Sequence, residues 1–137
     1  MAADSEAAPL VLVVDDFEDM RLMYSEYLAQ CGYRVATAAD GEEGLRVALS
    51  LRPAVVVLDL AMPVMDGWEA ARQLRSHPET KRAVIIAVTG NATARNRRLA
   101  MEAGCDHFIA KPFLPAALDG FIRRVLARND EAPVSGR

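Results

Sequence analysis

The stretch AVVVLD, residues 54–59, is five apolar residues followed by an aspartate, and similar patterns occur at three other places in the chain. These are LVLVVDD (10–16), AVIIAVT (83–89) and HFIAK (107–111), each a short, mostly apolar run that leads into a polar residue. If the runs are neighbouring parallel strands, their carboxyl ends meet at one edge of a sheet, where open α/β sheets bind ligands. The polar residues that would meet there are Asp15, Asp16, Asp59, Thr89 and Lys111.

The segments between these runs have helical periodicity. Residues 18–30 place Met20, Met23, Tyr24, Tyr27 and Leu28 at the spacing of one helix face, which predicts an amphipathic helix. Further helices are expected over 40–51, 66–76 and 92–103 and from Pro115 onward, and a strand over 33–38. A strand followed by a helix, repeated five times, predicts an α/β fold: a doubly wound (βα)5 domain with a five-stranded parallel sheet.

Local signals mark where several of these helices begin and end. Asp40 and Asp66 are expected to cap two helix N-termini, because their short side chains accept hydrogen bonds from free backbone N–H groups. Gly32 and Gly104 follow two other helices, where a residue with positive φ commonly ends the helix.

Composition indicates one ordinary globular domain. The chain has 137 residues, of which 52% are hydrophobic and 26% charged, with a formal net charge of −3. We expect the domain to cover residues 9–128, with flexible tails at 1–8 and 129–137. The N-terminus does not resemble a signal peptide and no segment is apolar enough to span a membrane, so a cytoplasmic protein is expected. Cys31 and Cys105 form no metal-binding pattern and are expected to be reduced and buried.

The convergent polar residues favour phosphoryl chemistry with a metal ion. Three neighbouring carboxylates repel one another unless a cation compensates them, and Mg²⁺ is the simplest cation that prefers oxygen ligands. Asp16 and Asp59 are candidates for direct ligands, with Asp15 holding a bound water and Ala61 offering its backbone carbonyl. A carboxylate can also attack phosphorus and form an aspartyl phosphate. Lys111 and Thr89 would then contact phosphoryl oxygens, whose charge must be stabilised during transfer.

Four motifs give the chain a clear resemblance to a known family. They are VVDD (13–16), VVVLDLAMPVMDGWE (55–69), AVTG (87–90) and AGCDHFIAKPF (103–113). Together they resemble the receiver domain of two-component response regulators, in particular single-domain regulators of the chemotaxis type, over about residues 9–128. The resemblance implies a flavodoxin-like sheet with strand order 2-1-3-4-5.

The resemblance also implies a role for each candidate residue. Asp59 would be the phosphorylated residue, Asp15 and Asp16 would complete the Mg²⁺ site, and Lys111 would contact the phosphoryl group. Thr89 and Phe108 would form the conformational switch, and the Lys111–Pro112 bond would be cis. Ala61 and Asn91, two residues after Asp59 and Thr89, would flank the path of an attacking water and tune the lifetime of the phosphorylated state.

Partners follow from the same resemblance. The phosphoryl group would come from a histidine kinase or a histidine phosphotransfer protein. A downstream protein would bind the face made by the helix over 92–103, the strand over 107–110 and the final helix. This face carries several arginines and is either a solvated surface or a docking site for an acidic partner or a second copy, so the protein would be a monomer or a weak homodimer. The arginines are Arg95, Arg97, Arg98, Arg123, Arg124 and Arg128.

Several alternatives remain open from sequence. The domain could act alone or belong to a hybrid histidine kinase or a multidomain regulator. An aspartate-nucleophile phosphatase acting on external substrates is disfavoured, because Ala61 stands where such enzymes place a general acid. We therefore expect the protein to catalyse only its own phosphorylation and slow dephosphorylation. Direct nucleic-acid binding is not expected from an acidic chain without a helix-turn-helix. A flavin-binding domain is disfavoured too, because the acidic pair would repel the phosphate of the ligand.

Overall fold

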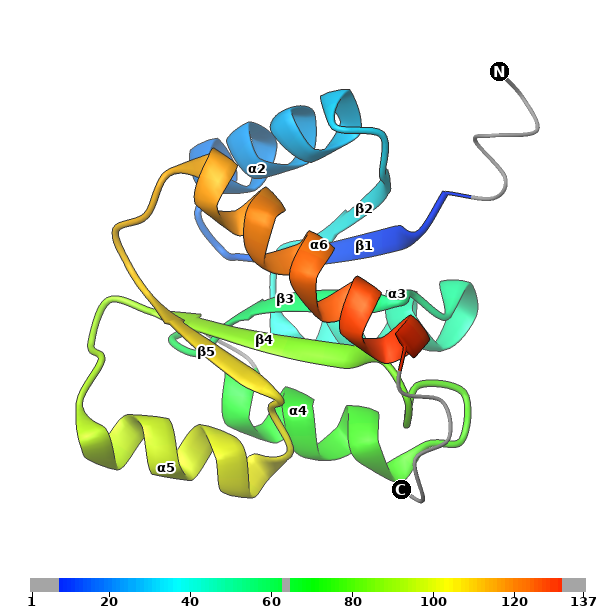
Figure 1. The fold of residues 1–137 in the computed structure, drawn as a ribbon. Coiled ribbons are helices and arrows are strands. Elements are labelled where there is room, and N and C mark those ends of the chain that lie inside the picture. Colours follow the sequence, from blue (N-terminus) through cyan, green and yellow to red (C-terminus); the bar gives the residue numbers. More distant parts are fainter. Residues whose placement is uncertain (1–7, 63–64, 132–137) are drawn as a thin grey trace.

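The structure, a computed structural model, describes residues 8–62 and 65–131 (Figure 1). In this part of the chain, five parallel strands form one sheet in the order β2-β1-β3-β4-β5, as the resemblance predicted. The strands are β1 (Leu10–Val14), β2 (Arg34–Ala38), β3 (Val55–Asp59), β4 (Val84–Thr89) and β5 (His107–Ala110). The helices are α2 (Glu18–Gln30), α3 (Gly41–Leu51), α4 (Gly67–Ser76), α5 (Ala94–Ala103) and α6 (Pro115–Glu131).

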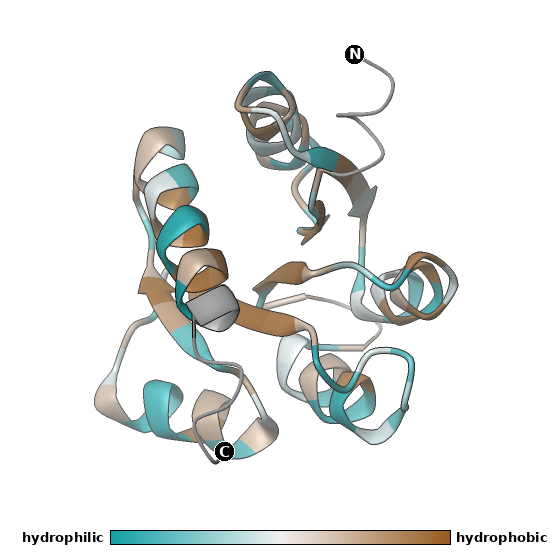
Figure 2. Cartoon of the chain, turned by 45° about the vertical axis from the view of Figure 1, so that its right-hand side comes forward, coloured by the Kyte–Doolittle hydropathy of each residue, from teal (hydrophilic) through white to brown (hydrophobic). Residues whose placement is uncertain are grey.

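The two faces of the sheet carry two separate hydrophobic clusters. Successive strand residues point to opposite faces, so Val11 and Val13 pack with α2 and α6, whereas Leu12 and Val14 pack on the side of α3, α4 and α5. Figure 2 shows hydrophobic residues concentrated on the central strands and hydrophilic residues on the surrounding helices. Strands buried on both faces explain the nearly continuous apolar runs in the sequence.

The predicted helix signals act as expected. The side chain of Asp40 accepts a hydrogen bond from the backbone N–H of Glu43 (2.8 Å), and that of Asp66 accepts one from Glu69 (2.9 Å). Gly32 and Gly104 have φ of 103° and 111°, a region that L-residues with a Cβ rarely adopt.

Several element boundaries differ from the prediction by one to three residues; β2, β3 and β4, for example, each begin one residue later than expected. Asp59 and Thr89 are the last residues of β3 and β4 rather than the residues after them, because backbone pairing continues through both positions. Helix α5 begins at Ala94 rather than Ala92, since Thr93 caps it by accepting from the N–H of Asn96 (3.0 Å). Helix α6 continues to Glu131, so 129–131 are helical rather than part of the predicted tail, and residues 121–132 contain no glycine or proline that would end the helix earlier. Residues 1–7 and 132–137 of the predicted tails lie outside the described part of the chain.

Two predicted core residues are more exposed than expected. Met23 is 40% exposed, because α6 covers only part of the apolar face of α2, and Cys31 is half-buried at the end of that helix, whereas Cys105 is buried. Among the described residues, no helix has both the length and the apolar character needed to cross a bilayer.

Candidate functional site

The predicted polar residues lie at the carboxyl ends of four neighbouring strands. Asp15 follows β1, Asp59 ends β3, Thr89 ends β4 and Lys111 follows β5. Asp15, Asp59 and Thr89 are only 3%, 7% and 4% exposed, whereas the neighbouring Asp16 is exposed. Parallel pairing therefore brings residues almost a hundred positions apart to one edge of the sheet.

The three acidic residues form a compact group. Asp15, Asp16 and Asp59 each offer a carboxylate oxygen, and these three atoms all lie within 4.8 Å of one another. Oxygen donors at this separation suit a hard divalent cation such as Mg²⁺, which binds through few protein oxygens and keeps several waters. The donor set thus fits the predicted ion.

Asp15 and Asp59 are held in the same way. One oxygen of each carboxylate accepts a backbone N–H two residues further on: Phe17 N–H donates to Asp15 Oδ1 (2.9 Å) and Ala61 N–H to Asp59 Oδ1 (3.0 Å). The second oxygen, Oδ2, of each faces the Lys111 ammonium, with Nζ 3.4 Å from both. These contacts fix both carboxylates and leave each Oδ2 pointing into the site.

Burial and charge shift two pKa values in the site. Desolvation raises the pKa of Asp59, and the Ala61 N–H and the Lys111 charge only partly oppose this effect. Burial also works against the charge of Lys111, but the carboxylates of Asp59 and Asp15 outweigh it, so the pKa of Lys111 is raised. The lysine therefore stays a cation, while Asp59 gains from any further positive charge placed beside it.

Thr89 lies next to this cluster on the neighbouring strand. Asp59 pairs with Val88 in the sheet register, so Thr89 is one residue further along the same edge, and its carbonyl accepts from Lys111 N–H (2.8 Å). The Thr89 hydroxyl accepts a hydrogen bond from the N–H of Asn91 (3.0 Å).

The remaining predicted positions are Ala61, Asn91, Phe108 and Pro112. Ala61 and Asn91 are both exposed. Phe108 is half-buried on β5, and the Arg97 guanidinium of α5 lies 4.7 Å from its ring centroid. The Lys111–Pro112 peptide bond is cis, as predicted.

Some contributors to the site were not predicted. Side-chain roles were predicted for Ala61 and Asn91, with the backbone carbonyl of Ala61 as a metal ligand. The structure adds that their backbone N–H groups hold Asp59 and Thr89. Arg21 also donates to the backbone carbonyl of Asp15 (2.8 Å). A Cβ on Gly67 would lie 2.5 Å from Leu60 Cα, so only glycine lets α4 begin this close to the end of β3. The Asp-Gly pair at the end of the MPVMDG motif was the available signal for Gly67.

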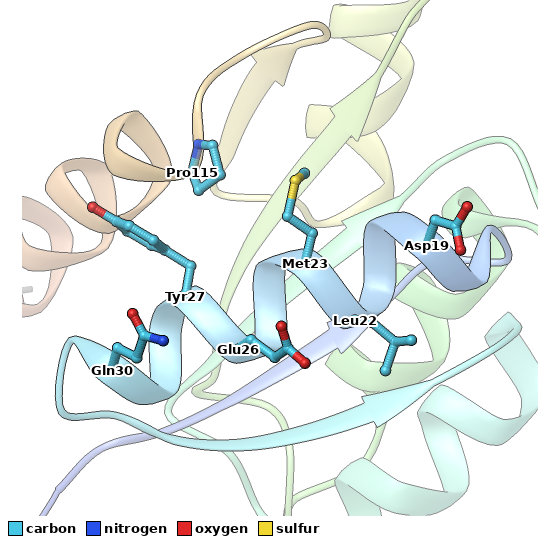
Figure 3. A pocket seen from close by; sticks show the side chains of 7 residues that line it. All are labelled: Asp19, Leu22, Met23, Glu26, Tyr27, Gln30 and Pro115. Atoms are coloured by element: carbon cyan, nitrogen blue, oxygen red, sulfur yellow. The ribbon is translucent and has the colours of Figure 1, made fainter.

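A hollow lies on the surface of α2, and none of the predicted site residues lines it. Figure 3 shows Met23 and Tyr27 extending from α2 on the side of Pro115, at the start of α6. The other residues that line it are Asp19, Leu22, Glu26 and Gln30.

The fold and the acidic cluster define a doubly wound α/β domain with a group of carboxylate oxygens beside a half-buried lysine. Residues 11–123 match the response regulator receiver domain family, and the chain belongs to that family. It therefore contains the receiver domain of a two-component response regulator.

Individual relatives agree with this assignment. A probable transcriptional regulator, ycf27, of Guillardia theta is 36% identical over 132 residues, which cover 96% of this chain and 51% of the relative. The chain spans about half the length of the curated relatives it matches. Chemotaxis protein CheY4 of Vibrio cholerae has a similar structure, with a TM-score of 0.83 and 35% identity, covering 86% of this chain and 98% of that one.

A further solved structure bears on the metal site. The receiver domain of sensor histidine kinase PA1611 from Pseudomonas aeruginosa PAO1, solved with a magnesium ion coordinated in its active-site cleft, is 33% identical with a TM-score of 0.79. The match covers 85% of this chain and 96% of that chain.

Proposed function

We propose that this receiver domain takes a phosphoryl group from a phosphohistidine onto Asp59 in a Mg²⁺-dependent reaction. The observation that carries the proposal is the pair of 3.4 Å contacts from Lys111 Nζ to Asp59 Oδ2 and Asp15 Oδ2, inside a cluster of three carboxylates. The donor is a histidine kinase or a histidine phosphotransfer protein, as membership of the family implies.

The two oxygens of Asp59 have different roles in this reaction. Oδ1 is held by the Ala61 N–H, so Oδ2 is the nucleophile. An O–P bond forms at Oδ2 as the N–P bond of phosphohistidine breaks, and the electron pair of that bond stays on the imidazole. Lys111 loses a carboxylate partner as Asp59 becomes an acyl phosphate, and its ammonium then contacts a phosphoryl oxygen. The Thr89 hydroxyl donates to another.

The acidic residues would hold the ion. Asp15, Asp16 and Asp59 would supply carboxylate oxygens, and the backbone carbonyl of Ala61 would be a further ligand. When bound, Mg²⁺ supplies positive charge that offsets the repulsion among the carboxylates and the negative charge of the phosphoryl oxygens.

The phosphorylated state would be read on the face formed by α5, β5 and α6. A shift of Thr89 toward the phosphoryl group moves the loop before α5, and Phe108 then turns inward. Arg97 and Phe108 line a pocket on this face together with Phe121. The cations on α5 and α6 suit an acidic partner or a second copy. Ala61 and Asn91 flank the path of water, and slow hydrolysis of the acyl phosphate ends the signal.

A protein donor needs a surface beside the site. Phe17 and Leu114 are 57% and 74% exposed, and Phe17 follows the acidic pair while Leu114 lies three residues after Lys111. Leu22 and Met23 on α2 are exposed as well, and they line the hollow beside Pro115 (Figure 3). We place the phosphohistidine donor on this surface.

One experiment tests the phosphorylated residue. Acetyl phosphate with Mg²⁺ should add one phosphoryl group to the native protein, measured as intact mass, and none to Asp59→Asn. Asp66→Asn is the matched control, since asparagine also caps helices, and it should be labelled normally. Label on Asp59→Asn would reject the assignment, and sustained turnover of a small phosphoester would favour an enzyme instead.

A second experiment tests the donor surface. Leu114→Asp should slow transfer from a phosphorylated histidine protein by about tenfold, the loss expected from one poorly paired interface group, while labelling by acetyl phosphate is unchanged. Leu51→Asp, at an exposed position on α3, is the control. Equal losses with both phosphodonors would indicate damage to the site rather than lost docking.

The same domain can also serve as the regulatory part of a longer protein, such as a transcriptional regulator or a hybrid kinase. The half-length matches to curated relatives favour this second candidate, and one neighbour in the solved structures is the receiver domain of a sensor kinase. The continuation of the reading frame tests it. We propose a cytoplasmic location for both candidates, consistent with the two free cysteines.

A further inference from the structure

Tyr24 is a buried residue of α2 whose hydroxyl has no evident role in packing. The residue is only 2% exposed, and among the residues that the structure describes its hydroxyl oxygen has no hydrogen-bond partner. A buried polar group without a partner is costly, and such groups in native proteins call for an explanation. Phenylalanine would fill the same space without this cost.

The Tyr24 ring packs against the segment that carries Lys111. It stacks on Phe113, with ring centroids 5.4 Å apart and planes inclined by 11°. Phe113 is two residues after Lys111, at the start of the connection from β5 to α6. The ring thus helps to fix the chain segment from which the lysine enters the site.

The hydroxyl end of Tyr24 lies within the electrostatic field of the site. Burial raises the pKa of Tyr24, and the charges of Lys111, Asp15 and Asp59 all act on it as well. In return, the interaction with Tyr24 contributes to raising the pKa of Lys111. The buried ring, its stacking on Phe113 and these charge interactions all connect Tyr24 with the segment that carries Lys111.

We propose that Tyr24 is a positioning residue for Lys111, with its hydroxyl accepting a hydrogen bond from the ammonium when Asp59 is phosphorylated. The inference rests on the proposed function. An ammonium has three donors, and in this structure two of them face Asp15 and Asp59. Phosphorylation removes the carboxylate charge of Asp59, so the ammonium turns toward the phosphoryl oxygen. The phenol oxygen then holds Nζ in the new position while Asp15 retains its contact.

The variant Tyr24→Phe tests this role because it keeps the ring and its stacking on Phe113. At saturating Mg²⁺ we expect labelling by acetyl phosphate to slow about tenfold, the effect of losing one hydrogen bond to a charged group. The Mg²⁺ concentration for half-maximal labelling should stay within about twofold, since the carboxylates hold the ion. Tyr33→Phe, the same change at a tyrosine before β2 and outside both the site and the hollow beside Pro115, should label at the native rate.

A double variant separates positioning from packing. In a Lys111→Met background, Tyr24→Phe should cause no further slowing, because the hydroxyl acts through the lysine. A further tenfold loss there would overturn the proposal, and so would a Tyr24→Phe protein that labels at the native rate. If the native protein takes no label at all, the proposed function fails and this role fails with it. Native labelling with an unaffected Tyr24→Phe removes only the role of Tyr24.

Discussion

Arg75 and Lys111 are two cations at opposite edges of the sheet, and each has a carboxylate partner. They differ in how many of their N–H donors are paired. At the amino ends of β4 and β5, Arg75 donates to the carbonyls of Gly104 (2.8 Å), Lys81 (2.8 Å) and Ala83 (2.7 Å) and pairs with Asp106. At the carboxyl ends, Lys111 has two contacts of 3.4 Å. The two cationic side chains are almost equally buried, at 24% and 23% exposed.

The difference in pairing indicates that Arg75 has a structural role and Lys111 a functional one. Four of the five N–H donors of Arg75 are occupied by groups of the folded chain, so it joins α4, α5 and two strands and leaves little for a ligand. Lys111 is held loosely between two carboxylates that repel each other, so part of its bonding capacity remains for a further anion. Burial alone therefore does not separate a structural cation from a functional one, whereas the completeness of its pairing does.

The largest effect on stability should come from breaking the saturated cluster. Arg75→Met keeps the length of the side chain but leaves three carbonyls and the Asp106 carboxylate without this partner. We expect the free energy of unfolding to fall by about 3 kcal/mol, measured by urea denaturation. Phosphorylation of the folded fraction should proceed at the native rate. A loss below about 0.5 kcal/mol, the range of ordinary surface substitutions, would contradict the structural role.

The opposite outcome is expected for the loosely paired cluster. Lys111→Met should slow phosphorylation by acetyl phosphate about 100-fold, the effect of removing one group that stabilises developing charge in a transition state. Its free energy of unfolding should change by less than about 1 kcal/mol, because long, partly exposed ion pairs contribute little. The rate is measured by intact mass and the stability by urea denaturation. If the two variants behaved alike in both assays, completeness of pairing would not distinguish the clusters.

The sequence predicted the functional cluster well and did not predict the structural one. Asp15, Asp59, Thr89 and Lys111 were found because each directly follows or ends an apolar run, and parallel pairing must then bring the run ends together. Arg75 gives no such signal: three of its partners are carbonyls, which any residue type can supply, and the fourth is a carboxylate 31 residues away. Side chains that act through the backbone of other elements cannot be recognised from residue type and spacing.

Tertiary packing limited the prediction in the same way at other positions. The apolar stripe of α2 was identified, but Met23 is exposed because the position of α6 decides how wide a face is covered. The unpartnered hydroxyl of Tyr24 and its stacking on Phe113 also depend on packing between α2 and the segment before α6. The strand ends at Asp59 and Thr89 were placed one residue early, because a polar side chain does not interrupt the backbone hydrogen bonds.

The smallest expected effect concerns the charge of Asp59 itself and tests whether the functional cluster is held under electrostatic repulsion. Burial raises the pKa of Asp59 above its ordinary value, so the folded protein binds this proton more tightly than the unfolded chain does. Stability from this group is therefore lost as pH rises from the ordinary pKa through the raised one. Asp59→Asn avoids that loss, and without metal at pH 7 it should be more stable by about 1 kcal/mol, the scale of one charge interaction near a protein surface.

The advantage of Asp59→Asn should disappear below the ordinary pKa, where both proteins are neutral at this position. Mg²⁺ should also reverse it, since an ion that binds the native cluster more tightly stabilises the native protein by mass action. Urea denaturation across pH, with and without Mg²⁺, measures both changes, and Asp66→Asn controls for the loss of one exposed carboxylate. A variant that is less stable than the native protein at pH 7 without metal would show that Lys111 already compensates Asp59 fully. The contrast between the saturated arginine and the unsaturated lysine would then be lost.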